Sequence, residues 1–339
     1  MDLLAEINKK IKDTPLQNSD SGIESILLHI EIAERHHNRA KSEKDEHLYT
    51  DVIYRTNHAF EGILKEAYSR LADKKPDSLT PFQIEEYLLT NNILRSRVSD
   101  LLTNYRKNWR NPSTHDHKLF FAEQESFLAI VTVSAFVSIL VDQIIDKITY
   151  TQNLEKFEKY AIRTREGYTK YNKMSSIDKL ARLILGFSEY YMENFEEMSQ
   201  TPRNSANAAL AAFIKKADPN FNVEQEPNIN KNGSSITFDL IAETNEEKIA
   251  IETRDPRPSG SHFFESEVAA KQLAIMLRKT EIRSGIIFHY PAAPHQSTLI
   301  TTGNTAWPTD CYFREVYTAD PSEVPIDDLY IEPEETNSL

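Results

Sequence analysis

The most constraining feature of the sequence is an uncharged apolar run, FLAIVTVSAFVSILV, over residues 127–141. Glu125 precedes the run and Asp142 follows it, so the run is shorter than the roughly 20 apolar residues that cross a bilayer. A helix that is apolar around most of its circumference is typically surrounded by other helices. We therefore expect residues 127–148 to form the buried helix of a bundle, with no attachment to a membrane.

Apolar residues recur at helical spacing through the first 150 residues. The stretch LTPFQIEEYLL predicts a helix with Thr80 as its N-cap and Pro81 in its first turn. A further apolar face, which includes Tyr105 and Trp109, predicts a helix that the following NPS should end, because the residue before a proline disfavours helical backbone. These patterns predict an all-α, antiparallel helical bundle over residues 1–150.

The second half of the chain has a different pattern. Residues 151–200 are helical but charged and amphipathic, and we interpret them as a helical connector or an added dimerisation element. Beyond residue 204, NAALAAFIKKA and FFESEVAAKQLAIMLRK predict helices, whereas SSITFDLIAET, IAIETR and SGIIFHY predict strands. The order helix, hairpin, helix, strand predicts a small α/β domain over residues 201–339 with an acidic tail. We thus expect a multi-domain chain.

Charge is distributed unevenly along the 339 residues. The formal net charge of −13 argues against nonspecific binding along duplex DNA, where phosphate contacts dominate affinity. Residues 93–118, however, contain six cationic residues and only two acidic ones. The cationic residues are Arg95, Arg97, Arg106, Lys107, Arg110 and Lys118, and the acidic ones are Asp100 and Asp116. The single cysteine, Cys311, and an N-terminus without a signal-peptide pattern predict a cytoplasmic protein.

A short motif, RNPSTH, lies within this basic segment. It places Arg110 next to the polar Asn111, with His115 after four intervening residues, and His117 would fit a spacing of six. Together with the helices around it, the motif resembles the HEPN superfamily, whose signature is an Arg, usually a polar residue after it, and a His four to six residues later. The spacing alone also fits Arg257 with His262 and Arg283 with His289, but those pairs lie outside the predicted bundle.

The resemblance to HEPN proteins implies a metal-independent endoribonuclease of a toxin or anti-phage defence system. Arg110, His115 and Asn111 would be catalytic, and Arg106, Lys107 and Lys118 would bind RNA. The chemistry suits these residue types, because an imidazole moves protons near neutral pH and a guanidinium holds phosphate oxygens in a planar fork. The family further implies a homodimer with a composite site and an antitoxin or defence-system partner, with no cofactor for RNA cleavage.

A second constellation lies in the α/β region, in FDLIAETNEEKIAIETR. Asp239 and Glu252 fall on two successive predicted strands, and Arg254 follows on the same face as Glu252. With the helix before them, they resemble the PD-(D/E)xK nuclease-like, or restriction-endonuclease-like, fold, in which an Asp and a Glu hold Mg²⁺ and a Lys helps to activate water. Here Arg254 stands in the Lys position, and Lys271 on the next helix is the alternative amine. The arginine favours a sensor or regulator domain.

Two other functions remain open at this level. In the first, the C-terminal domain is a Mg²⁺-dependent DNA endonuclease and the bundle only dimerises it. In the second, the chain is a noncatalytic protein that binds nucleic acid or a toxin.

Overall fold

The computed structural model describes residues 3–12, 14, 16, 22–115, 120–157, 160, 162–164, 171–231, 234–256, 262–301 and 310–319. The side chains of residues 114–115, 231, 234 and 262–266 lie outside the described part. The chain divides into two compact units, Met1–Thr149 and Tyr150–Leu339. A helical N-terminal part is thus followed by an α/β part with a mixed sheet, as the sequence predicts.

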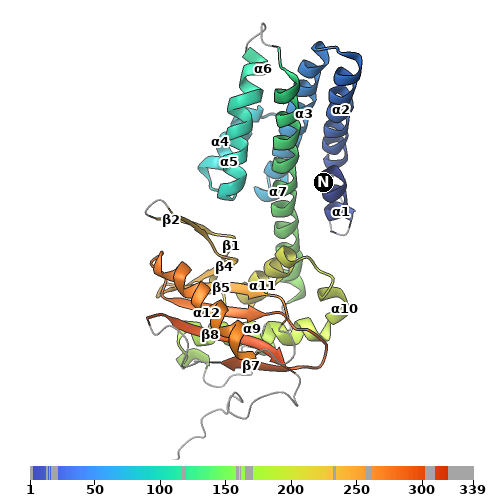
Figure 1. Cartoon of the computed structure of the whole chain (residues 1–339). Helices are drawn as coiled ribbons and strands as arrows, with labels where there is room; N and C mark the ends of the chain where they lie inside the picture. The colour runs from blue at the N-terminus through green and yellow to red at the C-terminus, as the bar shows by residue number, and fades with distance from the viewer. Residues whose placement is uncertain are drawn as a thin grey trace, which may run out of the picture. The chain divides into compact units, whose positions relative to one another are not determined.

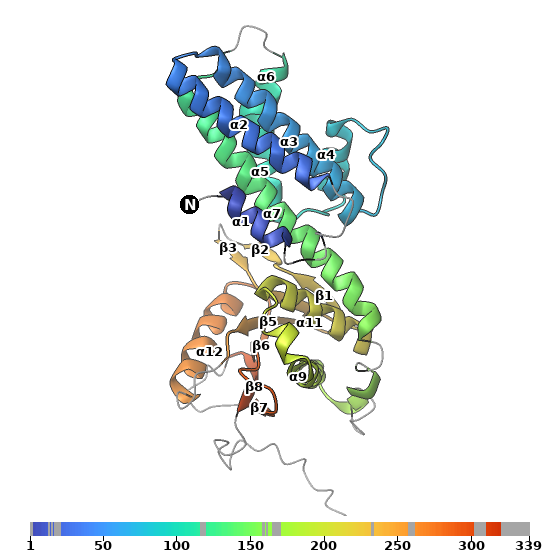
Figure 2. The same ribbon diagram turned by 90° about the vertical axis from the view of Figure 1, so that its right-hand side faces the viewer.

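The first unit is a bundle of helices (Figures 1 and 2). Its elements are α1 (Leu3–Lys12), α2 (Ile23–Glu43), α3 (His47–Leu71), α4 (Pro81–Thr90), α5 (Ser96–Tyr105), the π-helical turn η2 (Arg106–Arg110), α6 (Asn111–His115) and most of α7 (Glu123–Lys156). Both views show α2, α3 and α7 as long, neighbouring rods. One apolar core joins them, and in it the ring of Phe60 lies 4.7 Å from that of Tyr105 and 5.3 Å from that of Phe136.

The apolar helix α7 is less enclosed than the sequence predicts. Its length and composition would allow it to cross a membrane, yet 61% of its most apolar window is buried inside the structure. Its core side is covered by the bundle, whereas Phe127, Leu128 and Val131 are 54%, 51% and 37% exposed. The expectation of a helix surrounded on all sides is therefore wrong for its first turns, because α2, α3 and α5 pack against only part of its circumference.

The start of α4 follows the sequence prediction closely. The hydroxyl of Thr80 accepts a hydrogen bond from the backbone N–H of Gln83, and the Gln83 side chain accepts one from the N–H of Thr80, which makes a capping box. Pro81 occupies the first helical position, where its missing N–H costs nothing. This prediction is confirmed.

The helix containing Trp109 does not end at NPS. The chain instead widens into the π-helical turn η2, in which the N–H of Asn111 donates to the carbonyl of Arg106, and then continues as α6 to His115. In an α-helix, the ring of Pro112 would clash with the carbonyl four residues earlier. The extra residue in the turn relieves that clash, so the proline changes the helix geometry rather than stopping the helix.

The second unit is built around a six-stranded mixed sheet of order β1-β4-β5-β6-β8-β7. Its strands are β1 (Asn222–Gln225), β4 (Leu240–Glu243), β5 (Lys248–Arg254), β6 (Ser284–His289), β7 (Ser297–Thr301) and β8 (Tyr312–Ala319). The pairs β5–β6 and β6–β8 are parallel, and the other pairs are antiparallel. A separate antiparallel pair is formed by β2 (Asn228–Lys231) and β3 (Ser234–Thr237).

Helices cover both faces of this sheet, as Figure 2 shows. On one face pack α9 (Ser176–Glu193) and α11 (Arg203–Ala217), and on the other α12 (His262–Arg278). Neighbouring residues of β5 alternate between the two cores, since Ile249 and Ile251 belong to the first and Ala250 to the second. Shorter helical segments are η3 (Tyr171–Lys173) and α10 (Phe195–Met198).

The segment 151–200 differs from the connector that its charge pattern predicts. The apolar face of α9, with Leu183 and Phe187, shares a core with α11 and with strands β4, β5 and β6. The ring of Phe187 lies 5.7 Å from that of Phe213 and 6.2 Å from that of Phe288. An amphipathic helix buries its apolar stripe against another apolar surface. For α9 that surface is the sheet of the second unit, so α9 is part of the core of that unit and not a connector.

Candidate functional site

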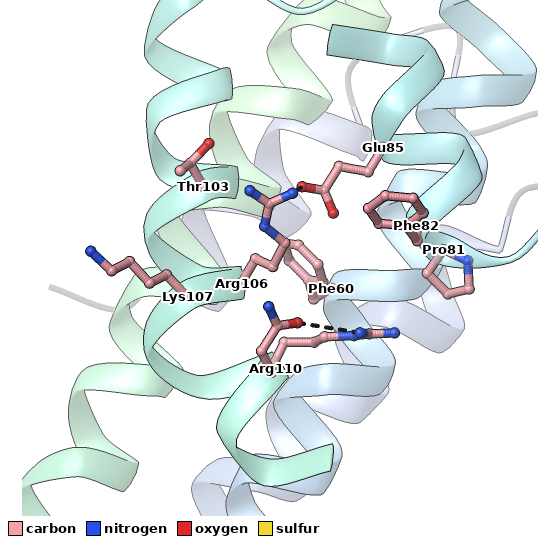
Figure 3. Close-up of a pocket in the computed structure, with 9 residues that line it drawn as sticks. Phe60, Pro81, Phe82, Glu85, Thr103, Arg106, Lys107 and Arg110 are labelled. Atoms are coloured by element: carbon pink, nitrogen blue, oxygen red, sulfur yellow. Dashed lines mark hydrogen bonds and ion pairs between the residues drawn. The ribbon is translucent and has the colours of Figure 1, made fainter. Parts of the chain in front are cut away.

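A pocket of about 400 Å³ opens beside the π-helical turn of the first unit (Figure 3). Phe60 of α3 and Pro81 and Phe82 of α4 form its apolar part. Its polar part consists of Glu85, Thr103, Arg106, Lys107, Arg110 and Asn111. Three cations therefore gather at one hollow of a chain whose net charge is −13.

Arg106 is held by an acidic partner inside the pocket. Its guanidinium Nη1 forms an ion pair with the carboxylate of Glu85, a residue that is only 3% exposed. Burial raises the pKa of the Glu85 carboxyl, and the positive charges of Arg106 and Arg110 lower it in part. The pair fixes the Arg106 side chain across the space between α4 and η2.

Arg110 lies one turn further along and is better placed to meet a ligand. Its Nε is 3.6 Å from Oε1 of Glu61 on α3, and its Nη1 donates to Oδ1 of Asn111 at 3.3 Å. The side chain is 22% exposed, so it is oriented by its neighbours but still reaches solvent. In Figure 3, Arg110 extends toward the side of Pro81, Arg106 reaches Glu85, and Lys107 extends away from them.

A buried hydrogen-bond network ties this turn to α3. The hydroxyl of Tyr105 lies 2.7 Å from Oγ1 of Thr56 and 3.0 Å from Oδ1 of Asn57. The amide of Asn57 donates to the hydroxyl of Ser113 at 2.8 Å, and that hydroxyl donates to the carbonyl of Arg110 at 3.0 Å. Burial raises the pKa of Tyr105, so its hydroxyl stays protonated as a donor. The network holds the backbone on both sides of Arg110 in place.

The structure brings together several of the residues that the sequence singles out. Arg106, Lys107, Arg110 and Asn111 all line the pocket. His115 is the last residue of α6, but its side chain lies outside the described part, and His117 and Lys118 lie outside the described residues. Arg95 is elsewhere, paired with Asp146 of α7 at 2.8 Å.

Sequence reasoning missed Glu85 and Phe82. Both lie in a short amphipathic helix, α4, whose apolar and acidic residues are typical of an ordinary packed helix. Phe82 follows Thr80 and Pro81 at the start of the helix, but no pattern in the sequence marks it as a pocket residue. Nothing in the sequence pairs Glu85 with Arg106, since the two are 21 positions apart.

In the second unit, Asp239 and Glu252 lie next to each other. The β4–β5 register pairs Leu240 with Ile251, so Asp239 falls opposite Glu252, and its N–H donates to Oε1 of Glu252 at 3.3 Å. Burial and the negative charge of Asp239 raise the pKa of Glu252 to about 7. Oδ2 of Asp239 accepts from the N–H and the hydroxyl of Thr253, at 2.8 and 2.9 Å.

Cationic side chains surround this acidic pair. Arg203, at the start of α11, approaches Oδ2 of Asp239 to 3.8 Å and donates to the hydroxyl of Thr253. Arg254 donates to the side chain of Gln272 on α12 at 3.3 Å. Lys271 forms an ion pair with Glu267 along the same helix. Arg203 was missed because it lies far from the strand motif in the sequence.

The fit of a Mg²⁺ ion to this pair is poor. Both carboxylates already accept hydrogen bonds from the protein, and Arg203 and Arg254 already place positive charge beside Glu252, so a metal ion would have to compete with both.

The other arginine–histidine spacings do not form a comparable site. Arg283 donates to the carbonyls of Thr280 and Ile282, while His289 is buried and lies 3.1 Å from Oε1 of Glu315. Arg257 and the side chain of His262 lie outside the described part.

Comparison with known proteins adds no relative. No family model matches the chain, and no curated protein and no solved structure is significantly similar to it.

Proposed function

We propose that the chain is a metal-independent endoribonuclease of the HEPN type. The observation that carries this proposal is the pocket at the π-helical turn, which is lined by Arg106, Arg110 and Asn111. Arg110 and Asn111 lie five and four positions before His115, the last residue of α6. Helices with π-type turns often carry functional residues at that point. The pocket gathers cationic side chains although the chain as a whole is acidic, which further supports a ligand that carries phosphate.

The reaction that suits these side chains uses the nucleophile of RNA itself. The 2′-oxygen attacks the adjacent phosphorus and the bond to the 5′-oxygen breaks, which gives a 2′,3′-cyclic phosphate and a 5′-hydroxyl. The imidazole of His115 takes or gives the proton, since its ordinary pKa is close to neutral. Arg110 binds two phosphate oxygens with its fork. Asn111 accepts from Arg110 with its oxygen, so its amide nitrogen is the donor for the phosphate.

The rest of the chain completes the proposal. The exposed apolar stripe of Phe127, Leu128 and Val131 supports a homodimer, as HEPN ribonucleases use. The order α11, β1, β4, β5, α12, β6 supports a PD-(D/E)xK-like fold for the second unit. Because Arg254 stands where that fold has a Lys, and Arg203 also lies beside the acidic pair, we assign that unit to sensing or regulation. The biological role would be that of a cytoplasmic toxin or defence effector with an antitoxin or defence-system partner.

RNA digestion tests the proposal directly. The wild-type chain should cleave a single-stranded RNA with and without EDTA, and Arg110→Ala and His115→Ala should each abolish cleavage. Arg39→Ala is the matched control, since Arg39 is an exposed arginine on α2 that forms an ion pair with Glu43 and does not line the pocket. Cleavage that persists in both active-site variants, or that EDTA stops, would contradict the assignment and favour the DNA endonuclease or the noncatalytic binding protein.

A further inference from the structure

The apolar wall of the pocket includes an aromatic ring that the core of the bundle does not bury. Phe60 at its base is buried, but Phe82 at its rim is 58% exposed. A single exposed ring is common on protein surfaces, but this one stands at the rim of a hollow that also holds arginines, so a ligand bound in the hollow would cover it. The ring therefore points to a ligand with an apolar or aromatic face.

The backbone under Phe82 is well fixed. Phe82 is the second residue of α4, between Pro81 at the first position and Gln83, whose side chain closes the capping box with Thr80. The proline fixes one backbone dihedral and the capping box fixes the helix start. The ring consequently stands on a rigid base, which lowers the entropy cost of a contact with a ligand.

The groups facing Phe82 define the rest of the ligand. Arg110 extends toward the side of the pocket on which Pro81 and Phe82 lie, and Arg106 reaches Glu85 of the same helix (Figure 3). A ligand that contacts both the Phe82 ring and Arg110 needs a planar π-face and, next to it, a negative charge. A nucleotide has both, and a pocket of about 400 Å³ is within the roughly 300–1,000 Å³ typical of small-molecule sites.

We propose that Phe82 is a base-stacking residue and that the pocket takes one unpaired nucleotide of a single-stranded RNA, with its phosphate at Arg110. This inference rests on the proposed function and narrows its substrate. A base inside a duplex already stacks on its neighbours and cannot lie on a protein ring, whereas bases of single strands and loops stack on aromatic side chains. Duplex RNA is therefore excluded from the pocket.

Binding, measured apart from cleavage, tests the proposal. A fluorescein-labelled 2′-O-methyl RNA single strand has no free 2′-hydroxyl and cannot be cleaved, so fluorescence anisotropy reports affinity for the full chain. Phe82→Ala should weaken binding by about 5- to 100-fold, in the range known for loss of one stacked base. Phe82→Leu should be nearly as weak, since it keeps apolar volume but has no π-face, and Phe82→Trp should bind at least as well as the wild type.

The controls separate stacking from other causes. Tyr54→Ala removes a ring that is 55% exposed on α3 but does not line the pocket, and its affinity should be unchanged. The matching duplex should bind much more weakly than the single strand. Thermal melting of Phe82→Ala should match that of the wild type, because the ring is largely in solvent.

Each result decides one proposal. The inference is overturned if the wild type does not bind the single strand, or if Phe82→Ala or Phe82→Leu binds as the wild type does, even when RNA cleavage is present. If binding depends on the Phe82 ring but unmodified RNA is never cleaved, the stacking site stands and the ribonuclease assignment fails.

Discussion

The carboxylate of Glu85 and the guanidinium of Arg106 form an ion pair in which the acid is almost fully buried and the base is partly exposed. The pair joins α4 to the π-helical turn and so fixes the position of the turn that carries Arg110. Arg106 thus has a buried counter-charge, whereas Arg110 lies 3.6 Å from the more exposed Glu61 and donates to Asn111.

Removal of Arg106 should lower the stability of the first unit. Arg106→Ala leaves Glu85 buried without its cation, at a cost of about 1–3 kcal/mol in the free energy of unfolding. Lys107→Ala is the matched control, since Lys107 is adjacent and extends away from Glu85, and it should cost less than about 0.5 kcal/mol. Urea unfolding of the two variants measures the difference, and equal stability would contradict a structural role for the pair.

The cost of Arg106→Ala should depend on pH. Burial raises the pKa of Glu85 above its ordinary value of 4.5, so the folded state disfavours the charged carboxylate and stability is lost as the pH rises through the raised pKa. Arg106 opposes that loss, and its removal therefore matters most near pH 7. Below pH 4.5, Glu85 is neutral in either state and the destabilisation should be small. A cost that is the same at pH 4 and pH 7 would refute this origin.

Local patterns of the sequence were sufficient to predict the start of α4 and the order of the elements from α11 to β6 in outline. Thr80 and Pro81 specify the start of α4 by chemistry within one turn, and β4 and β5 follow from adjacent alternating residues. The strands β7 and β8 were not predicted, because β8 pairs with β6 from far along the chain and its burial depends on that pairing. The sequence likewise did not show that α9 is a core helix, because its apolar side packs on the sheet and α11, which come together only in the folded unit.

The same distinction applies to the site. Arg110, Asn111 and His115 are close in sequence, so a local motif identifies them. Glu85 and Phe82 reach the pocket only because α4 packs beside the turn, and a single sequence has no local signal for such a contact. Pro112 predicted a helix end, because proline usually breaks or kinks an α-helix. In the structure, the wider π-helical turn before Pro112 accommodates the proline ring, so the helix continues.

In the second unit, Glu252→Gln should stabilise the protein in a pH-dependent manner. The pKa of Glu252 is about 7 when folded, against an ordinary 4.5, so its contribution to stability is present below pH 4.5 and is lost as the pH rises toward 7 and beyond. Glutamine imitates the neutral acid and can still accept the hydrogen bond from Asp239. The gain should approach about 2–3 kcal/mol at pH 8 and vanish near pH 4.5. Calorimetry of the unfolding transition at both pH values checks this, and a gain independent of pH would disprove it.

Mg²⁺ should not support DNA cleavage by this chain. Arg254 stays protonated and cannot share a proton with water as a Lys of lowered pKa does, and Lys271 is paired with Glu267. A supercoiled plasmid incubated with Mg²⁺ should remain intact with the wild type and with Glu252→Ala alike. Robust cleavage that is lost in Glu252→Ala would show that the second unit is a DNA endonuclease.

The apolar stripe on α7 should be covered by a second copy of the chain. Leu128→Glu places a charge within that stripe and should convert a homodimer into a monomer in light scattering at micromolar concentration, with loss of RNA cleavage if the site is composite. Leu28→Glu is the matched control, since Leu28 is 50% exposed on α2, and it should leave the dimer intact. A wild-type monomer that cleaves RNA would remove the composite-site model.

The last prediction concerns the roles of Arg110 and the two histidines. Arg110→Lys should lower the rate of RNA cleavage by about 100-fold or more, because a point charge loses the fork that holds two phosphate oxygens. His115→Ala should abolish cleavage, whereas His117→Ala should have a mild effect, which distinguishes the spacing of four from that of six. Products should end in a 2′,3′-cyclic phosphate, and DNA of the same sequence should survive, since it has no 2′-hydroxyl. Mass spectrometry of the products decides the chemistry. Products with a plain 3′-hydroxyl, or a strong defect in His117→Ala beside a mild one in His115→Ala, would require a different nucleophile or a different histidine.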